Sequence, residues 1–139
     1  MNGTVTHLFL KTGHGEPMQP AEQVQAEGGQ GLVGDLSHGV KKRQILLVER
    51  EVLSDFGLSP GQIKENITVS GLRLRDLAPG ARLQVGETEL AVYGDCAPCQ
   101  FIDDIRPGLR AEMEGQRGTL CWVATGGQIR RGDPVRVLP

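Results

Sequence analysis

Glycine and proline interrupt this sequence so often that no apolar segment becomes long. The 139 residues include 20 glycines and 8 prolines, and these are scattered between the apolar runs instead of forming one block. Scattered Gly and Pro are typical of turns. Because a short apolar run bounded by turn residues favours a β-strand, the sequence predicts a mainly β protein with about seven short strands.

The expected strands are the segments where apolar and β-branched residues cluster or alternate. They cover Thr4–Lys11, Gln44–Val48, Ile67–Val69, Arg82–Val85, Thr88–Tyr93, Gly118–Thr125 and Pro134–Leu138. Gly86-Glu87 suits a two-residue hairpin, and Gly126-Gly127 is expected to form a turn. Because so many short strands would otherwise expose their edges, we expect a β-barrel or a closely folded sheet.

Helical spacing of apolar residues occurs in two places. One is Glu49–Phe56, and the other lies between Cys99 and Gly115, where Pro107 must interrupt any single helix. We therefore expect one or two small helices beside short, mixed strands. The length fits a single domain spanning residues 1–139.

Charge and cysteine content exclude several classes of protein. The chain has 15 Lys and Arg against 17 Asp and Glu, a formal net charge of −2, which argues against general binding of nucleic acid or an anionic membrane. No run approaches the length of a membrane span and no secretory leader is recognisable, so we expect a cytoplasmic protein. Three cysteines, an odd number, favour reduced thiols over disulfides.

The sharpest local motif is Cys96-Ala97-Pro98-Cys99, which follows a predicted strand. Its spacing suits half of a zinc site, a dithiol redox pair or two ordinary buried thiols. No second cysteine pair completes a zinc site, and the βαβ context of thioredoxin-like motifs is missing. Cys121 alternates with apolar residues along a predicted strand, so we expect it to pack in the core.

Three polar segments are candidates for anion or ligand binding. The first combines Asp35 and His38 with the consecutive cations Lys41-Lys42-Arg43, and such a loop either holds a phosphate or is simply solvated. In the second, Asn66 either closes a turn or presents its amide to a ligand. The segment around Arg130 and Arg131 is similarly open between a solvated turn and an anion contact.

Taken in order, these motifs resemble the MOSC domain, the family named after the C-terminal domain of molybdenum cofactor sulfurases. The resemblance extends from about residue 13 to the C-terminus, as for a stand-alone MOSC domain. It is carried by His14-Gly15-Glu16-Pro17-Met18, Gly31-Leu32-Val33-Gly34-Asp35, Arg43-Gln44-Ile45-Leu46-Leu47, Glu65-Asn66-Ile67-Thr68-Val69-Ser70-Gly71-Leu72, Leu77-Ala78-Pro79-Gly80, Cys96-Ala97-Pro98-Cys99 and Gly126-Gly127-Gln128-Ile129-Arg130-Arg131-Gly132-Asp133.

The resemblance implies a barrel-like β fold and a role in molybdenum-cofactor chemistry. In the family, the cysteine after the proline is the position that ligates molybdenum or carries sulfur, and here it is Cys99. The resemblance makes His38, Arg43 and Asn66 candidate contacts of the pterin cofactor. Lys42 and Arg130 are further cations expected near the site.

Two residues depart from the pattern that many relatives share. Leu36 and Glu65 both stand where an arginine is frequent.

The function implied by the resemblance is binding of the pterin-molybdenum cofactor (molybdopterin), sulfur transport on Cys99, or both. Such a protein would be a sulfur transferase or a component of a molybdenum-dependent reductase, with a sulfur donor or acceptor enzyme as partner. The residues alone leave two alternatives open, a dithiol redox protein that uses Cys96 and Cys99, and a non-catalytic binding module.

Overall fold

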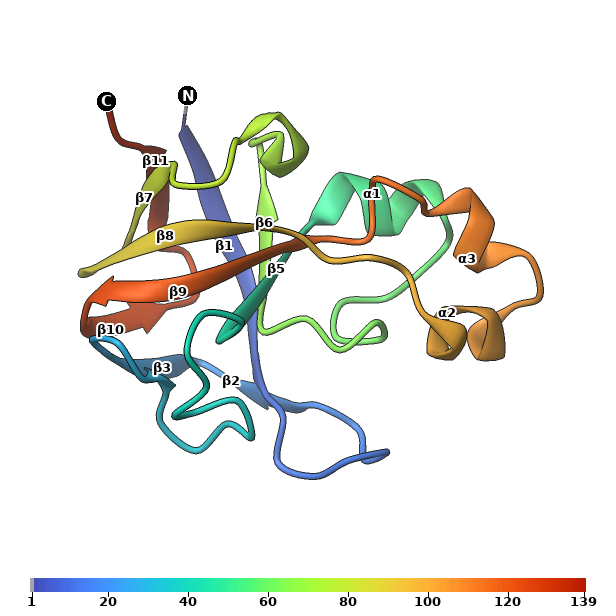
Figure 1. The fold of residues 1–139 in the computed structure, drawn as a ribbon, viewed down its shortest axis with the longest axis horizontal. Coiled ribbons are helices and arrows are strands. Elements are labelled where there is room, and N and C mark those ends of the chain that lie inside the picture. The colour runs from blue at the N-terminus through green and yellow to red at the C-terminus, as the bar shows by residue number, and fades with distance from the viewer. Residues whose placement is uncertain (1) are drawn as a thin grey trace.

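Eleven strands and a few short helices alternate along residues 2–139, the part of the chain that the computed structural model describes (Figure 1). The elements are β1 (Asn2–Leu10), β2 (Gln19–Ala21), β3 (Gln23–Glu27), β4 (Gly31–Leu32), β5 (Ile45–Glu49), α1 (Arg50–Asp55), β6 (Ile67–Ser70), the 3-10 helix η1 (Leu74–Asp76), β7 (Arg82–Val85), β8 (Thr88–Asp95), α2 (Gln100–Ile105), α3 (Leu109–Glu112), β9 (Thr119–Thr125), β10 (Gly127–Arg130) and β11 (Pro134–Val137).

A closed β-barrel forms the body of the protein. Its strands follow the order β11-β7-β8-β9-β5-β6-β1, and β1 pairs with β11 to complete the ring, while β2 extends the sheet from β1. The pairing of β5 with β6 is parallel and the other pairings are antiparallel. The expectation of a mainly β, barrel-like fold of short mixed strands is therefore confirmed.

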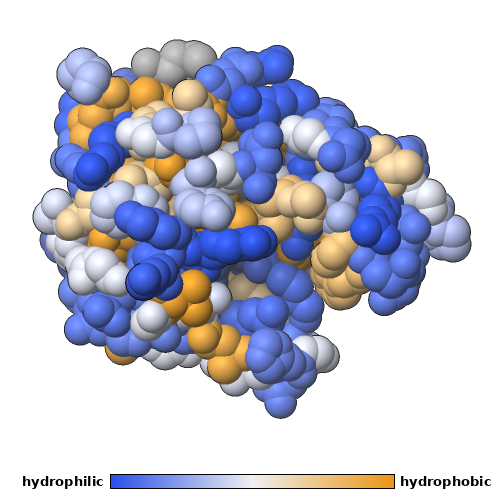
Figure 2. Space-filling view, in the orientation of Figure 1, coloured by the Kyte–Doolittle hydropathy of each residue, from blue (hydrophilic) through white to orange (hydrophobic). Residues whose placement is uncertain are grey.

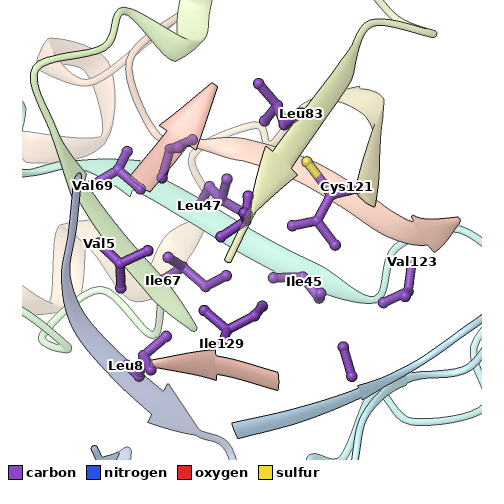
Figure 3. Close-up of a cluster of buried hydrophobic side chains, with 14 of the residues drawn as sticks. Val5, Leu8, Ile45, Leu47, Ile67, Val69, Leu83, Cys121, Val123 and Ile129 are labelled. Carbon is purple, nitrogen blue, oxygen red and sulfur yellow. The ribbon is translucent and has the colours of Figure 1, made fainter. Parts of the chain in front are cut away.

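The barrel interior is filled by one side of each strand, as Figure 3 shows. Leu90 and Val92 of β8 point into it, and Cys121 and Val123 of β9 do the same. Cys121 is fully buried, as expected, and burial raises the pKa of its thiol to about 12.

Strand β5 is buried on both faces, which explains its uninterrupted apolar sequence. Ile45 and Leu47 face the barrel interior, whereas Leu46 and Val48 belong to a second cluster with side chains of α1, α2 and α3. The helices therefore lie together on one side of the barrel, on the right in Figure 1. The structure thus has three short α-helices, and the 3-10 turn η1 packs through Leu74 in the barrel core, so there are more helices than the one or two expected.

A small sheet of β10, β3 and β4 covers one end of the barrel. The sequence-based prediction of a turn at Gly126-Gly127 was wrong here. Gly127 begins a strand instead of completing a turn, and β10 pairs with the polar strand β3. Only Val24 and Ala26 of β3 are buried, so its apolar signal is weak. The Gly86-Glu87 hairpin is confirmed, with Gly86 at φ +55 in the position where a type II′ turn favours glycine.

Exposed hydrophobic residues are few on the mainly hydrophilic face shown in Figure 2. The large ones among residues 2–139 are Val33, Leu36, Val40 and Tyr93, three of which lie in the segment between β4 and β5. No helix in residues 2–139 has the length and apolar content needed to cross a membrane.

Candidate functional site

A cavity of about 150 Å³ opens where the chain enters β5. Its walls come from four separate segments, namely the end of β1, the loop before β5, the loop before β6 and the residues that lead into β9. The charged and amide residues that line it are Lys11, Asp35, Arg43, Gln44, Lys64, Asn66 and Arg117. Four cationic residues thus surround one carboxylate, and we call this cavity the cationic pocket.

A hydrogen-bond network around Asn66 builds one wall of the cationic pocket. The buried Asn66 amide oxygen accepts from the backbone N–H of Leu46 at 3.0 Å, and its nitrogen donates to the carbonyl of Phe9 at 3.2 Å. The same nitrogen donates to Asp35 Oδ1 at 2.9 Å. Asn66 therefore fastens the loop that holds Asp35 to strands β1 and β5.

Both carboxylate oxygens of Asp35 accept hydrogen bonds from other parts of the protein. Its Oδ1 also accepts from the backbone N–H of Lys11 at 2.6 Å, and its Oδ2 accepts from that of Ser37 at 3.0 Å. The buried Asp35 carboxylate is thus hydrogen-bonded through both of its oxygens within the protein. Asp35 and Asn66 therefore shape the wall of the pocket through their own hydrogen bonds.

Gln44 fixes the loop that places Arg43. This buried amide donates to the carbonyls of Gly29 and Val40 at 2.9 and 2.7 Å, and accepts from the backbone N–H of Val123 at 2.9 Å. Arg43, the preceding residue, is exposed and lines the pocket. Gln44 was not among the predicted site residues, although it belongs to the motif that begins with Arg43.

Arg117 is the least expected member of the pocket, because it is only 5 % exposed. Its Nη2 donates to the carbonyl of Ile63 at 2.7 Å, while Nε and Nη1 have no hydrogen-bond partner. Nothing in the sequence Gln116-Arg117-Gly118 indicates burial. The nearest sequence signal is Gly118, whose φ of +146 and close packing on β5 draw this segment inwards.

Lys64 was also missed, and its backbone is unusual. It is the one non-glycine residue of the described chain with a positive φ, +68, a conformation that often marks functional sites. Its ammonium group donates to the carbonyl of Glu16 at 2.6 Å and lies 5.6 Å from the ring centre of Phe101. Lys64 thus connects the cationic pocket with the start of α2.

Glu65, the buried residue that follows Lys64, fixes the loop before β6 by hydrogen bonds. Its Oε2 accepts from the N–H of Gly61 and the hydroxyl of Thr68, both at 2.9 Å. The carboxylate that replaces the family's frequent arginine therefore points into the protein.

Cys99 is exposed and lies between β8 and α2, outside the residues that line the pocket. Its segment is nevertheless tied to the pocket region, because the N–H of Cys96 donates to the carbonyl of Gly118 at 2.9 Å. Phe101, two residues after Cys99, lies beneath Lys64. The guanidinium of Arg110 donates to the carbonyl of Pro98 at 3.3 Å and supports the loop from the other side.

The other predicted contacts do not join the pocket. His38 Nε2 lies 2.6 Å from Glu27 Oε1. Lys42 places its ammonium 3.9 Å from the ring centre of Trp122. Arg130 lies on β10, where its Nη1 is 3.6 Å from Glu87 Oε2.

Residues 2–139 contain no group of three or more His, Cys, Asp or Glu side chains arranged to hold a metal ion. The three cysteines are all free thiols, and Cys121 lies in the barrel core, away from the Cys96 and Cys99 segment. A zinc site built from the cysteines is therefore not formed.

The comparisons with known proteins agree with this architecture. The YuaD protein of Bacillus subtilis has a similar crystal structure, with a TM-score of 0.83 and 22% identity over 99% of this chain and 96% of that one. YiiM from Geobacillus stearothermophilus gives a TM-score of 0.74 and 18% identity over 99% and 75% of the two chains. YiiM from Escherichia coli gives 0.74 and 19% over 100% and 70%.

Similarities at this level of identity establish the fold. A search of curated proteins finds no match. The sequence profile of the MOSC domain, however, matches residues 35–136, which include Cys99 and all the lining residues of the cationic pocket except Lys11. This chain belongs to the MOSC domain family, a family associated with the molybdenum cofactor.

Proposed function

We propose that this protein handles the pterin-molybdenum cofactor, with the cationic pocket as its seat and Cys99 as the residue that ligates molybdenum or carries sulfur. The observation that supports this function is the convergence of three separate family motifs. Gly34-Asp35, Arg43-Gln44 and Glu65-Asn66 belong to three separate segments of the chain, and all contribute residues to one cavity. The bond from Asn66 to Asp35 joins two of them directly.

The residues present fit the proposed group chemically. The cations Arg43, Lys64 and Arg117 suit an anionic cofactor, and a cysteine thiolate is a soft ligand suited to molybdenum. When bound, the cofactor supplies redox chemistry at the metal. The protein's own part is to bind the anionic portion, to keep the pocket shape through Asn66 and to present a thiol.

Exposure of the three thiols favours Cys99 for either role. Cys121 is fully buried and Cys96 is half-buried, whereas Cys99 is exposed. As a sulfur carrier, the Cys99 thiolate would attack the outer sulfur of a persulfide on a donor desulfurase. The new S–S bond forms on Cys99, and the donor cysteine leaves as a thiolate that takes up the proton. This form of the proposal makes the protein a sulfur transferase, and the ligand form makes it a reductase component.

The test measures molybdenum and the fluorescent oxidation product of the pterin in protein purified from a molybdenum-competent host. We expect both in the wild type and neither in Cys99→Ala, with Cys96→Ala as the matched control that keeps them. The cofactor-binding form fails if the wild type is free of pterin and takes none up during reconstitution. The sulfur-carrier form then depends on a mass increase of one sulfur on Cys99 after incubation with a desulfurase.

The dithiol alternative differs from the cofactor proposal because it requires the Cys96 thiol. It requires a reversible bond between Cys96 and Cys99, so Cys96→Ser would abolish function. Full function in that variant excludes the alternative, while the cofactor proposal tolerates the change.

A further inference from the structure

A second cavity, of about 400 Å³, lies beside the cationic pocket and shares only Lys64 with it. Its walls come from the end of β1, the loop between β1 and β2 and the loop before β6. The lining residues that matter here are Phe9, Pro17, Met18, Pro60, Gly61 and Lys64. We call this cavity the second pocket. Its volume is in the range of roughly 300–1,000 Å³ that small-molecule sites occupy.

The apolar part of the second pocket is held in a fixed shape. Phe9 and Met18 line it although they are only 7% and 8% exposed, so they form its floor. The Phe9 ring lies parallel to that of His7, with ring centres 6.2 Å apart and an angle of 7° between the planes. On the other side, a Cβ added to Gly61 would lie 2.8 Å from Phe9 Cε1. The ring is therefore kept in one orientation by its neighbours.

Lys64 adds one positively charged donor to these apolar walls. Its ammonium group donates to the carbonyl of Glu16 at 2.6 Å, and this bond joins the loop before β6 to the loop between β1 and β2. An ammonium group has three N–H bonds, so Lys64 can also donate to an acceptor on a ligand. The same group lies 5.6 Å from the ring centre of Phe101, two residues after Cys99. The polar end of the second pocket therefore faces the Cys99 segment.

We propose that the second pocket binds a planar aromatic or heteroaromatic molecule, with an oxygen or nitrogen acceptor directed at Lys64. Three groups of the wall favour a π system over an aliphatic one. A phenyl ring such as Phe9 stacks against other rings, the thioether of Met18 makes favourable contacts with ring edges, and the ammonium group of Lys64 is attracted to a ring face.

The position of the second pocket gives this molecule a role beside the cofactor. In the reductase form of the proposed function, on which this role rests, the aromatic molecule is the substrate. Because the two pockets share only Lys64, the molecule and the pterin can be bound at the same time. Binding of the aromatic molecule itself does not depend on the cofactor.

The experiment is a titration with benzamide, which combines a planar ring with a carbonyl acceptor, followed by NMR of methionine methyl groups labelled with ¹³C. The protein is made in a host that cannot synthesise the pterin. We expect the ring current of benzamide to shift the methyl signal of Met18, and the shift to saturate. The signal of Met113, which is fully buried among the helices, should not move.

Two variants test the contacts separately. Lys64→Met should weaken benzamide binding roughly tenfold, because a charged donor is lost, and Lys41→Met is its control because Lys41 is exposed and outside both pockets. Phe9→Leu should weaken binding about threefold to tenfold through loss of stacking. Its control is Phe56→Leu, outside the pocket in the helix cluster. If Phe9→Leu does not fold, Lys64→Met alone decides.

Cyclohexanecarboxamide, which has the same amide on a puckered ring, tests the preference for a planar molecule. We expect it to compete with benzamide only weakly, and equal competition would overturn the aromatic assignment. An unmoved Met18 signal in the wild type would overturn the proposal as a whole, as would wild-type affinity in Lys64→Met or in a folded Phe9→Leu.

These failures are distinct from failure of the proposed function. A protein that takes up pterin but binds no benzamide contradicts only the aromatic site. One that binds benzamide but never takes up pterin contradicts only the cofactor function. Protein loaded with pterin should bind benzamide as the pterin-free protein does, and competition between the two would contradict the substrate role.

Discussion

The cationic pocket and the Cys99 segment are held by the fold in different ways. Asn66 and Asp35, at the pocket wall, are buried and joined to three strands or loops by side-chain hydrogen bonds. Cys99 is exposed and its side chain makes no such bond. In the function we propose, the hydrogen-bonded pocket holds the ligand in a fixed geometry, and the exposed Cys99 thiol is the reactive group.

The largest expected difference between the two regions is in stability. Asn66→Ala leaves the Leu46 N–H without its partner in a buried place, so we expect a loss of about 3 kcal/mol in the free energy of unfolding. Cys99→Ala should change it by less than about 0.5 kcal/mol. Urea denaturation measures both, and Gln100→Ala is an exposed control for loss of a side-chain amide. Equal losses at positions 66 and 99 would contradict the comparison.

The second prediction concerns Gly118, whose backbone leads from Arg117 of the pocket into β9. An alanine Cβ there would lie 2.9 Å from the carbonyl oxygen of Leu47 at a strained φ of +146, so we expect Gly118→Ala to cost about 2 kcal/mol. The matched control is Gly94→Ala on β8, where nothing lies within 4 Å of the added carbon. A neutral Gly118→Ala in urea denaturation would show that this entry into β9 is not tightly packed.

Alkaline pH tests the burial of the Cys121 thiol. Burial raises the Cys121 pKa from 9.0 to about 12, so above pH 9 the unfolded chain releases a proton that the folded chain keeps. Stability therefore falls by about 1.4 kcal/mol per pH unit between these values from this group. Comparing urea midpoints at pH 9 and pH 10, the wild type should lose stability relative to Cys121→Ala. A pH-independent difference between the two proteins would contradict burial as the cause.

The smallest effect is expected at Arg130, which sequence analysis associated with the site. Its partner Glu87 is exposed and the pair is 3.6 Å apart, and exposed ion pairs contribute little to stability. Arg130→Ala should therefore change the free energy of unfolding by less than about 0.5 kcal/mol. A loss as large as that of Asn66→Ala would mean that β10 belongs to the same rigid unit as the pocket wall.

The barrel could be predicted because its strands carry their own signal. The apolar run of β5 and the alternation in β8 and β9 follow from which faces are buried. Strands β3 and β10 were missed because each is mostly polar. Their pairing is decided by residues about 100 positions apart in the sequence, which no local pattern reveals.

The pocket was predicted only in part, for a related reason. Arg43 and Asn66 stand in recognisable motifs, and both line the cavity. Arg117 has no motif of its own visible in the sequence, and its burial depends on how Gly118 packs against β5. Lys42 and Arg130 were chosen by charge alone, and the fold gives each another neighbour, Trp122 and Glu87 respectively.

The central claim is that the cationic pocket and Cys99 serve one ligand. The most direct measurement is the pterin content per protein chain of the wild type, Arg43→Gln and Cys99→Ala, each expressed separately in the same molybdenum-competent host. Arg73→Gln is the surface control. We expect pterin in the wild type and the control, and its loss in both other variants while their folding is intact. Wild-type pterin content in either Arg43→Gln or Cys99→Ala would contradict the claim.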